Sequence, residues 1–76
     1  MSGNYTYYTF EQLKKMSKHL LDERKILNEE QLANGMKMFN IAYLSLAQDT
    51  TDLDRHQAGM LYRIMHREIP VLANLA

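Results

Sequence analysis

Residues 28–48, NEEQLANGMKMFNIAYLSLAQ, decide the fold of this chain. Asn28 followed by Gln31 forms a capping-box pattern, and Glu29 and Glu30 lie where the helix dipole favours negative charge. Large apolar residues then recur at alternating intervals of four and three positions, which is the spacing of one helix face. These residues are Leu32, Met36, Phe39, Tyr43 and Leu46. The pattern predicts a helix over 29–48 that packs against other helices.

The flanking segments predict two further helices. Thr9 and Gln12 repeat the capping box ahead of a helix over about 10–25, whose apolar stripe is Phe10, Leu13, Met16, Leu20 and Leu21. Thr51 or Asp52 is expected to cap a helix over about 53–68. The apolar side of this third helix, expected to hold the fold, carries Leu53, Ala58, Met60, Leu61, Ile64, Met65 and Ile69.

The chain has three glycines and one proline, too few breaks for a sheet. We therefore predict an all-α single domain over 1–76, a compact three-helix bundle of up-down-up topology. Pro70 is expected to end or kink the last helix and to lead into one more apolar turn. A short aromatic arm with Tyr5, Tyr7 and Tyr8 precedes the first helix. Its rings either plug the end of the core or take part in an interface.

Composition excludes several classes of protein. Because the chain has no cysteine, disulfides and thiolate metal sites are excluded, which fits a reducing cytoplasm. No apolar run approaches the roughly 20 residues of a membrane span, and the N-terminal residues lack the pattern of a signal peptide. We expect a cytoplasmic protein that does not contact membranes. Its net charge is zero, so any attraction to an anionic partner must come from a local patch.

The predicted helix over 29–48 has a second apolar strip. Met38, Ile41 and Leu44 fall on the side opposite the core-facing stripe, and we call them the outer strip. A helix that is apolar nearly all round is normally buried all round, and a three-helix protein has no fourth helix to cover it. Either the crossing angles of the bundle bury part of the strip, or it forms an interface. We favour an interface, most simply a homodimer.

The predicted helix over 53–68 has a side of one charge sign within RHQAGMLYRIMHR, residues 55–67. This basic face consists of Arg55, His56, Gly59, Tyr62, Arg63, His66 and Arg67. No acidic residue falls on it, and arginine is enriched where proteins bind carboxylates and phosphates. Gly59, at its centre, would let a partner approach the backbone. The alternative is an ordinary solvated helix face, with the charges neutralised by acids elsewhere in the fold.

These features predict a small non-enzymatic regulator, of inhibitor or adaptor type, that docks its basic face on an acidic surface of another protein. The alternative partner is nucleic acid, with the arginines on phosphates and Tyr62 on a base. We rank protein first, because the chain is neutral whereas dedicated nucleic-acid domains are usually basic.

Metal sites and catalysis find no support in the sequence. Asp49, Asp52 and Asp54 do not match the EF-hand pattern, which needs a glycine at its sixth position and a glutamate at its twelfth. His56 and His66 lie about 15 Å apart along a helix, too far to share one ion. No nucleophile elbow or phosphate-binding glycine loop occurs. We expect no catalytic residue, no metal and no cofactor.

Overall fold

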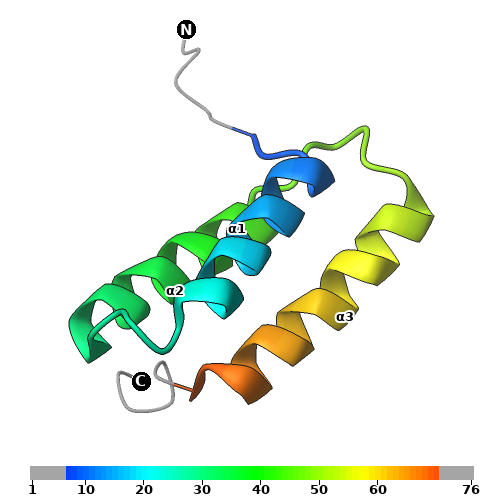
Figure 1. The fold of residues 1–76 in the computed structure, drawn as a ribbon. Helices are drawn as coiled ribbons and strands as arrows, with labels where there is room; N and C mark the ends of the chain where they lie inside the picture. The colour runs from blue at the N-terminus through cyan, green and yellow to red at the C-terminus, as the bar shows by residue number, and fades with distance from the viewer. Residues whose placement is uncertain (1–6, 71–76) are drawn as a thin grey trace, which may run out of the picture.

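The computed structural model describes residues 7–70 and is a bundle of three helices. They are α1 (Phe10–Glu23), α2 (Glu29–Leu44) and α3 (Asp52–Glu68). In Figure 1, α1 and α2 lie side by side and α3 runs alongside this pair. α2 and α3 contact each other less extensively than either contacts α1. The predicted all-α bundle is confirmed. None of these helices combines the length and apolar character that a membrane crossing needs.

Each helix begins at the cap that the sequence predicts. Thr9 Oγ1 accepts a hydrogen bond from the Gln12 amide at 3.1 Å, and the Gln12 side chain accepts one from the Thr9 amide at 2.8 Å. Asn28 and Gln31 form the same reciprocal pair, at 2.8 and 3.0 Å. Thr51 caps α3 with its side-chain oxygen. Since an N-cap satisfies amides that the helix leaves unpaired, these residues set the three starting points.

The core lies where the three helices meet. Its buried apolar residues are Leu13, Leu20, Met36, Phe39, Ala42, Leu46, Ala58, Met65 and Ile69. Ser17 is the one buried polar side chain in the described part of the chain, and its hydroxyl donates to the Lys14 carbonyl at 2.8 Å. The hydroxyl is therefore buried without losing its hydrogen bond.

α3 buries a narrower stripe than its sequence predicts. Leu53 and Met60, placed on its core side by the sequence pattern, are 65% and 52% exposed. Because α3 packs through Ala58 and Met65, residues on the opposite side of its axis point to solvent. The expectation that Leu53 and Met60 hold the fold is wrong.

α2 ends at Leu44, four residues earlier than predicted. The Tyr8 amide donates to the Ser45 carbonyl at 2.9 Å, and the Ala47 amide donates to the Tyr8 carbonyl at 3.0 Å. This parallel bridge between Tyr8 and Leu46 uses the Ser45 carbonyl and the Ala47 amide, whereas the Ser45 amide still donates to the Ile41 carbonyl as the last helical bond. The first helix also ends early, at Glu23 rather than near residue 25, whereas α3 ends at Glu68 as predicted.

The N-terminal arm is extended, as expected, over its described part. Tyr8 is half-buried and packs on the core, whereas the Tyr7 side chain is exposed. The ring of Tyr8 thus covers one end of the bundle. Tyr5 lies outside the described residues, and so does the apolar turn expected after Pro70.

Gly35 allows α1 and α2 to approach closely. A Cβ atom built at this position would overlap the Cδ2 methyl of Leu20. Leu20 is buried, so its side chain has little room to move away. The contact between α1 and α2 therefore depends on the missing side chain at position 35.

Candidate functional site

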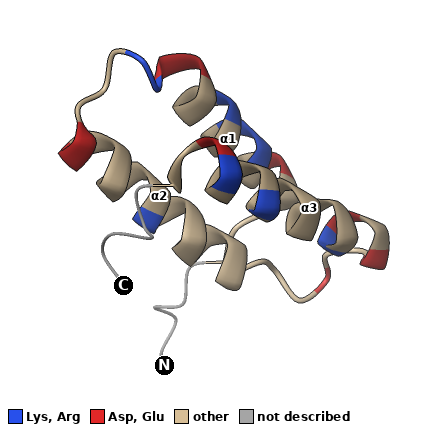
Figure 2. Ribbon diagram, turned by 90° about the horizontal axis from the view of Figure 1, so that it is seen from below, with Lys and Arg blue, Asp and Glu red and all other residues tan. Residues whose placement is uncertain are grey.

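The residues of the predicted basic face occupy two different environments. Tyr62 and His66 are half-buried and turn toward α2, whereas His56, Arg63 and Arg67 are exposed. In Figure 2, basic residues are spaced along α3 and acidic residues lie at its two ends. The face therefore divides into an inner part that contacts α2 and an outer part open to solvent.

The inner part is a row of stacked rings. The Tyr43 and Tyr62 rings stack with centroids 4.7 Å apart and an interplanar angle of 25°. The His66 ring packs on Tyr62 at 4.4 Å, and its Nε2 lies 2.9 Å from Asn40 Oδ1. Because an amide oxygen can only accept, the imidazole donates this hydrogen bond. The row joins α2 to α3 and forms an aromatic wall beside the exposed arginines.

Arg55 is held at the beginning of α3. Its Nη2 donates to the Ala47 carbonyl at 2.8 Å, across the connection between α2 and α3. The guanidinium has five N–H donors, so this bond leaves others available to a ligand. Arg55 thus has a set position while keeping its charge.

A hollow lies between the inner and the outer part of the basic face, and we call it the arginine hollow. Its volume is about 300 Å³, and its lining residues are Tyr43, Arg55, His56, Gly59, Met60, Tyr62 and Arg63. A Cβ on Gly59 would lie 3.5 Å from the Tyr43 hydroxyl, an ordinary contact, so the fold does not require glycine there. Instead, Gly59 leaves backbone accessible within the hollow.

The charge of the arginine hollow is not neutralised by ion pairs within the described residues. The described residues form five ion pairs, and only one of these involves the basic face. In that pair, Arg67 Nε lies 3.5 Å from Glu68 Oε2. The same glutamate binds Arg24 Nη1 more closely, at 2.9 Å. Within the described residues, the positive charges of Arg55 and Arg63 are therefore not compensated by an ion pair.

A second hollow lies on the other side of α3, against α1. This apolar hollow has a volume of about 360 Å³ and is lined by Phe10, Lys14, Gln57, Met60, Leu61 and Ile64. Lys14 Nζ lies 5.0 Å from the centroid of the Phe10 ring. Met60 borders both hollows. Sequence reasoning missed Tyr43, Phe10, Lys14 and Met60; the available signal was an apolar residue, Met60, next to Gly59.

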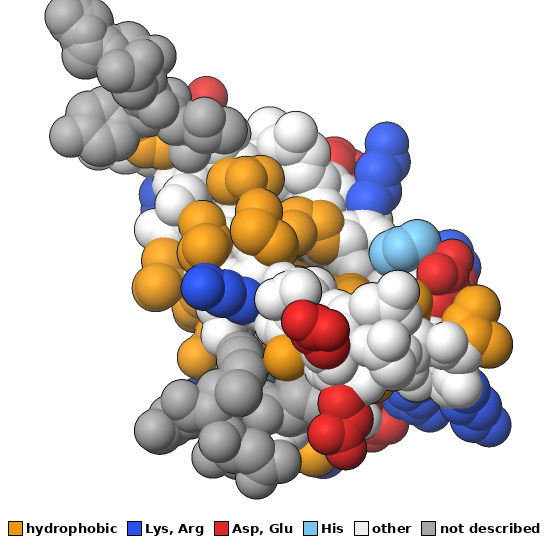
Figure 3. Space-filling model, turned by 90° about the vertical axis from the view of Figure 1, so that its left-hand side faces the viewer, with side chains coloured by type: hydrophobic (Ala, Val, Ile, Leu, Met, Phe, Trp, Pro, Cys, Tyr) orange, Lys and Arg blue, Asp and Glu red, His pale blue; other side chains and the backbone are white. Residues whose placement is uncertain are grey.

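The outer strip lies on the surface of α2. Met38, Ile41 and Leu44 are 47%, 42% and 81% exposed. Figure 3 shows hydrophobic side chains gathered on the side of the molecule formed by α1 and α2. Three partly exposed side chains make up only a fraction of the roughly 800 Å² that each partner buries in a standard interface. A stable interface here would have to include the surrounding polar residues.

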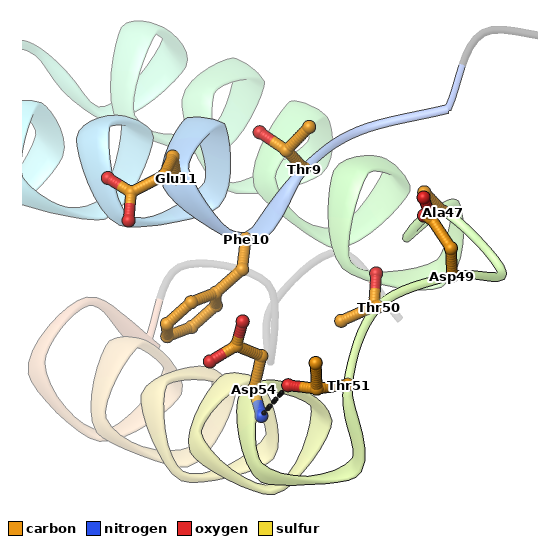
Figure 4. Close-up of a pocket in the computed structure, with 8 residues that line it drawn as sticks. All are labelled: Thr9, Phe10, Glu11, Ala47, Asp49, Thr50, Thr51 and Asp54. Carbon is orange, nitrogen blue, oxygen red and sulfur yellow. Dashed lines mark hydrogen bonds between the residues drawn. The ribbon is translucent and has the colours of Figure 1, made fainter.

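A third hollow, of about 200 Å³, lies where α1 begins, beside the connection between α2 and α3. In Figure 4, Phe10 and Asp54 face each other across it, and Asp49 and Thr50 approach from the connecting segment. In the part of the chain that the structure describes, no three His, Cys, Asp or Glu side chains converge on a point where they could hold a metal ion. The acidic residues around this third hollow therefore form no candidate metal centre.

The arginine hollow and its border with the apolar hollow are the best-defined candidate site. Both volumes lie near the lower end of the range for small-molecule pockets, about 300–1,000 Å³, and each suits a single side chain. Comparisons with protein-family models, with curated proteins and with solved structures find no match to this chain.

Proposed function

We propose that this protein is a small non-enzymatic binding protein that docks the basic face of α3 on an acidic surface of another protein, as an inhibitor or adaptor does. The observation that carries this proposal is the arginine hollow, in which Arg55 and Arg63 lack an acidic partner within the described part of the bundle. A guanidinium binds a carboxylate through two parallel hydrogen bonds, so a Glu or Asp side chain suits this hollow.

The row of rings favours protein over nucleic acid as the partner. Sequence-tolerant binding of single strands relies on aromatic rings whose faces are free to stack on bases. Tyr62 is stacked on Tyr43 and also packs on His66, so its ring is engaged within the fold. Contacts to the phosphates would have to come from a few arginines on a chain whose net charge is zero. Nucleic acid is therefore the weaker candidate.

We also propose that the outer strip supports self-association through α2. The supporting observation is the exposure of Met38, Ile41 and Leu44 on one helix surface. Because the strip is small, a dimer formed through it is weak and depends on protein concentration.

Binding of a labelled glutamate-rich peptide, duplex DNA and single-stranded RNA tests the docking proposal, at about 50 mM and about 200 mM salt. The peptide is expected to bind the native chain and to lose affinity for Arg63→Glu. Lys37→Glu is the matched control, because it makes the same change of charge at an exposed position on α2. Equal peptide binding by both variants would refute docking through α3. Tighter binding of DNA or RNA than of the peptide at the higher salt would replace protein with nucleic acid.

A further inference from the structure

We propose that the acidic partner presents an extended segment that crosses α3, with a carboxylate in the arginine hollow and a large apolar side chain, four residues away, in the apolar hollow. This inference rests on the proposed docking function and adds the sequence pattern of the partner.

The two hollows lie on opposite flanks of the exposed side of α3. Gly59 and Arg63, one helical turn apart, line the first, and Leu61 and Ile64 line the second. Met60 lies between the two flanks in helical projection and borders both hollows. A segment that fills both hollows must therefore pass over Met60. Methionine suits this position, because its flexible thioether adapts to the surface laid upon it.

The separation of the hollows fits an extended segment. They flank one helix, whose width with side chains is about 10–12 Å. An extended chain rises about 3.3 Å per residue and alternates its side chains, so residues four apart point the same way and lie about 13 Å apart. Residues three apart would point in opposite directions. On a partner helix, side chains one turn apart on one face are only about 5–6 Å apart, too close to reach both hollows, so a helix would have to use residues two turns apart and place the intervening turn over Met60.

The lining of each hollow matches one of the two side chains. A carboxylate entering the first hollow meets the unpaired Arg63 guanidinium and the backbone at Gly59, with the Tyr43 hydroxyl nearby. A leucine entering the second hollow meets aliphatic and aromatic carbon, with Lys14 at its rim. Lys14 forms an ion pair with Glu11 at 2.9 Å, which compensates its charge. The second hollow is therefore less positive than the first.

The first peptide has a central glutamate and a leucine four residues away on each side, so that it tests the inference in either chain direction. The first control peptide has the same composition, with the leucines three residues from the glutamate. The second control replaces both leucines with serine. Measured by NMR titration, the first peptide is expected to bind about tenfold more tightly than either control and to shift the amide signals of residues in both hollows.

Variants of α3 separate this inference from the docking proposal. Ile64→Ser, which lines the apolar hollow but not the arginine hollow, is expected to weaken the first peptide to the level of the serine control and to leave that control unchanged. Arg63→Glu is expected to weaken both. Equal affinity for the first peptide and the serine control overturns the two-hollow inference while leaving docking on the arginines in place. Binding of the glutamate peptides that Arg63→Glu does not weaken overturns the docking proposal itself.

Discussion

The two helical glycines of the bundle predict opposite responses to the same substitution. Alanine is favoured over glycine within a helix by about 1 kcal/mol, which both sites gain. At position 59 the new methyl group lies 3.5 Å from the Tyr43 hydroxyl, so the gain has no steric offset. We expect Gly59→Ala to raise the free energy of unfolding by about 0.5–1 kcal/mol, which corresponds to a rise in Tm of about 5 °C for a domain of this size.

Gly35→Ala places its methyl group against the buried Leu20 side chain. Overpacking of a core contact costs about 1–3 kcal/mol, and the middle of this range exceeds the helical gain by about 1 kcal/mol. We expect a net loss of about 1 kcal/mol and a fall in Tm of several degrees. Thermal unfolding followed by circular dichroism measures both variants. A lower Tm for Gly59→Ala than for Gly35→Ala would refute the assignment of close packing to position 35.

The Gly59→Ala variant also probes the candidate site without damaging the fold. The added methyl group projects into the arginine hollow, where the carboxylate is expected to lie. We expect weaker binding of the glutamate peptides together with greater stability. Unchanged peptide affinity in this more stable variant would show that ligands do not enter the hollow at position 59.

Three further predictions follow from the packing and charges of the helices. Tyr62→Ala removes the stack on Tyr43 and is expected to lower the free energy of unfolding by about 2 kcal/mol in urea denaturation. Leu44→Glu should leave stability within about 0.5 kcal/mol but abolish concentration-dependent association in sedimentation; association that survives this change would rule out the outer strip. The hydrogen bond from Lys18 to Asp22, reinforced by the carboxylate charge, raises the pKa of Lys18 above 10.5, so its stabilising effect is complete below that pH and disappears above the folded-state pKa. Asp22→Asn should lower this pKa in an NMR titration, and an unchanged pKa would show that the pair does not form in solution.

The sequence was sufficient for the elements that depend on local patterns. Thr9, Asn28 and Thr51 carry the side chains that N-caps require, so the three helix starts were predictable. Met36 and Phe39 lie on a stripe of helical period, which identified them as core residues. Both kinds of signal reside within a few consecutive residues.

The remaining features depend on contacts between distant segments. The end of α2 is set by Tyr8, far away in the chain, and nothing within residues 45–48 indicates this pairing. The rotation of α3 about its axis, which exposes Met60 and turns His66 toward Asn40, depends on packing against two helices at once. A helical projection supplies only relative angles within one helix. The outer arginines could therefore be predicted, but not the two hollows.

One residue, Ala47, connects the N-terminal arm to the basic face of α3. The amide of Ala47 donates to the Tyr8 carbonyl, and the carbonyl of the same residue accepts from Arg55. The arm thus supplies two of the hydrogen bonds that fix residues 45–47, the segment whose carbonyl holds the Arg55 guanidinium. The position of Arg55 in the candidate site is thus set by residues outside α3. Deletion of Tyr8 is therefore expected to disturb the position of Arg55 as well as the arm.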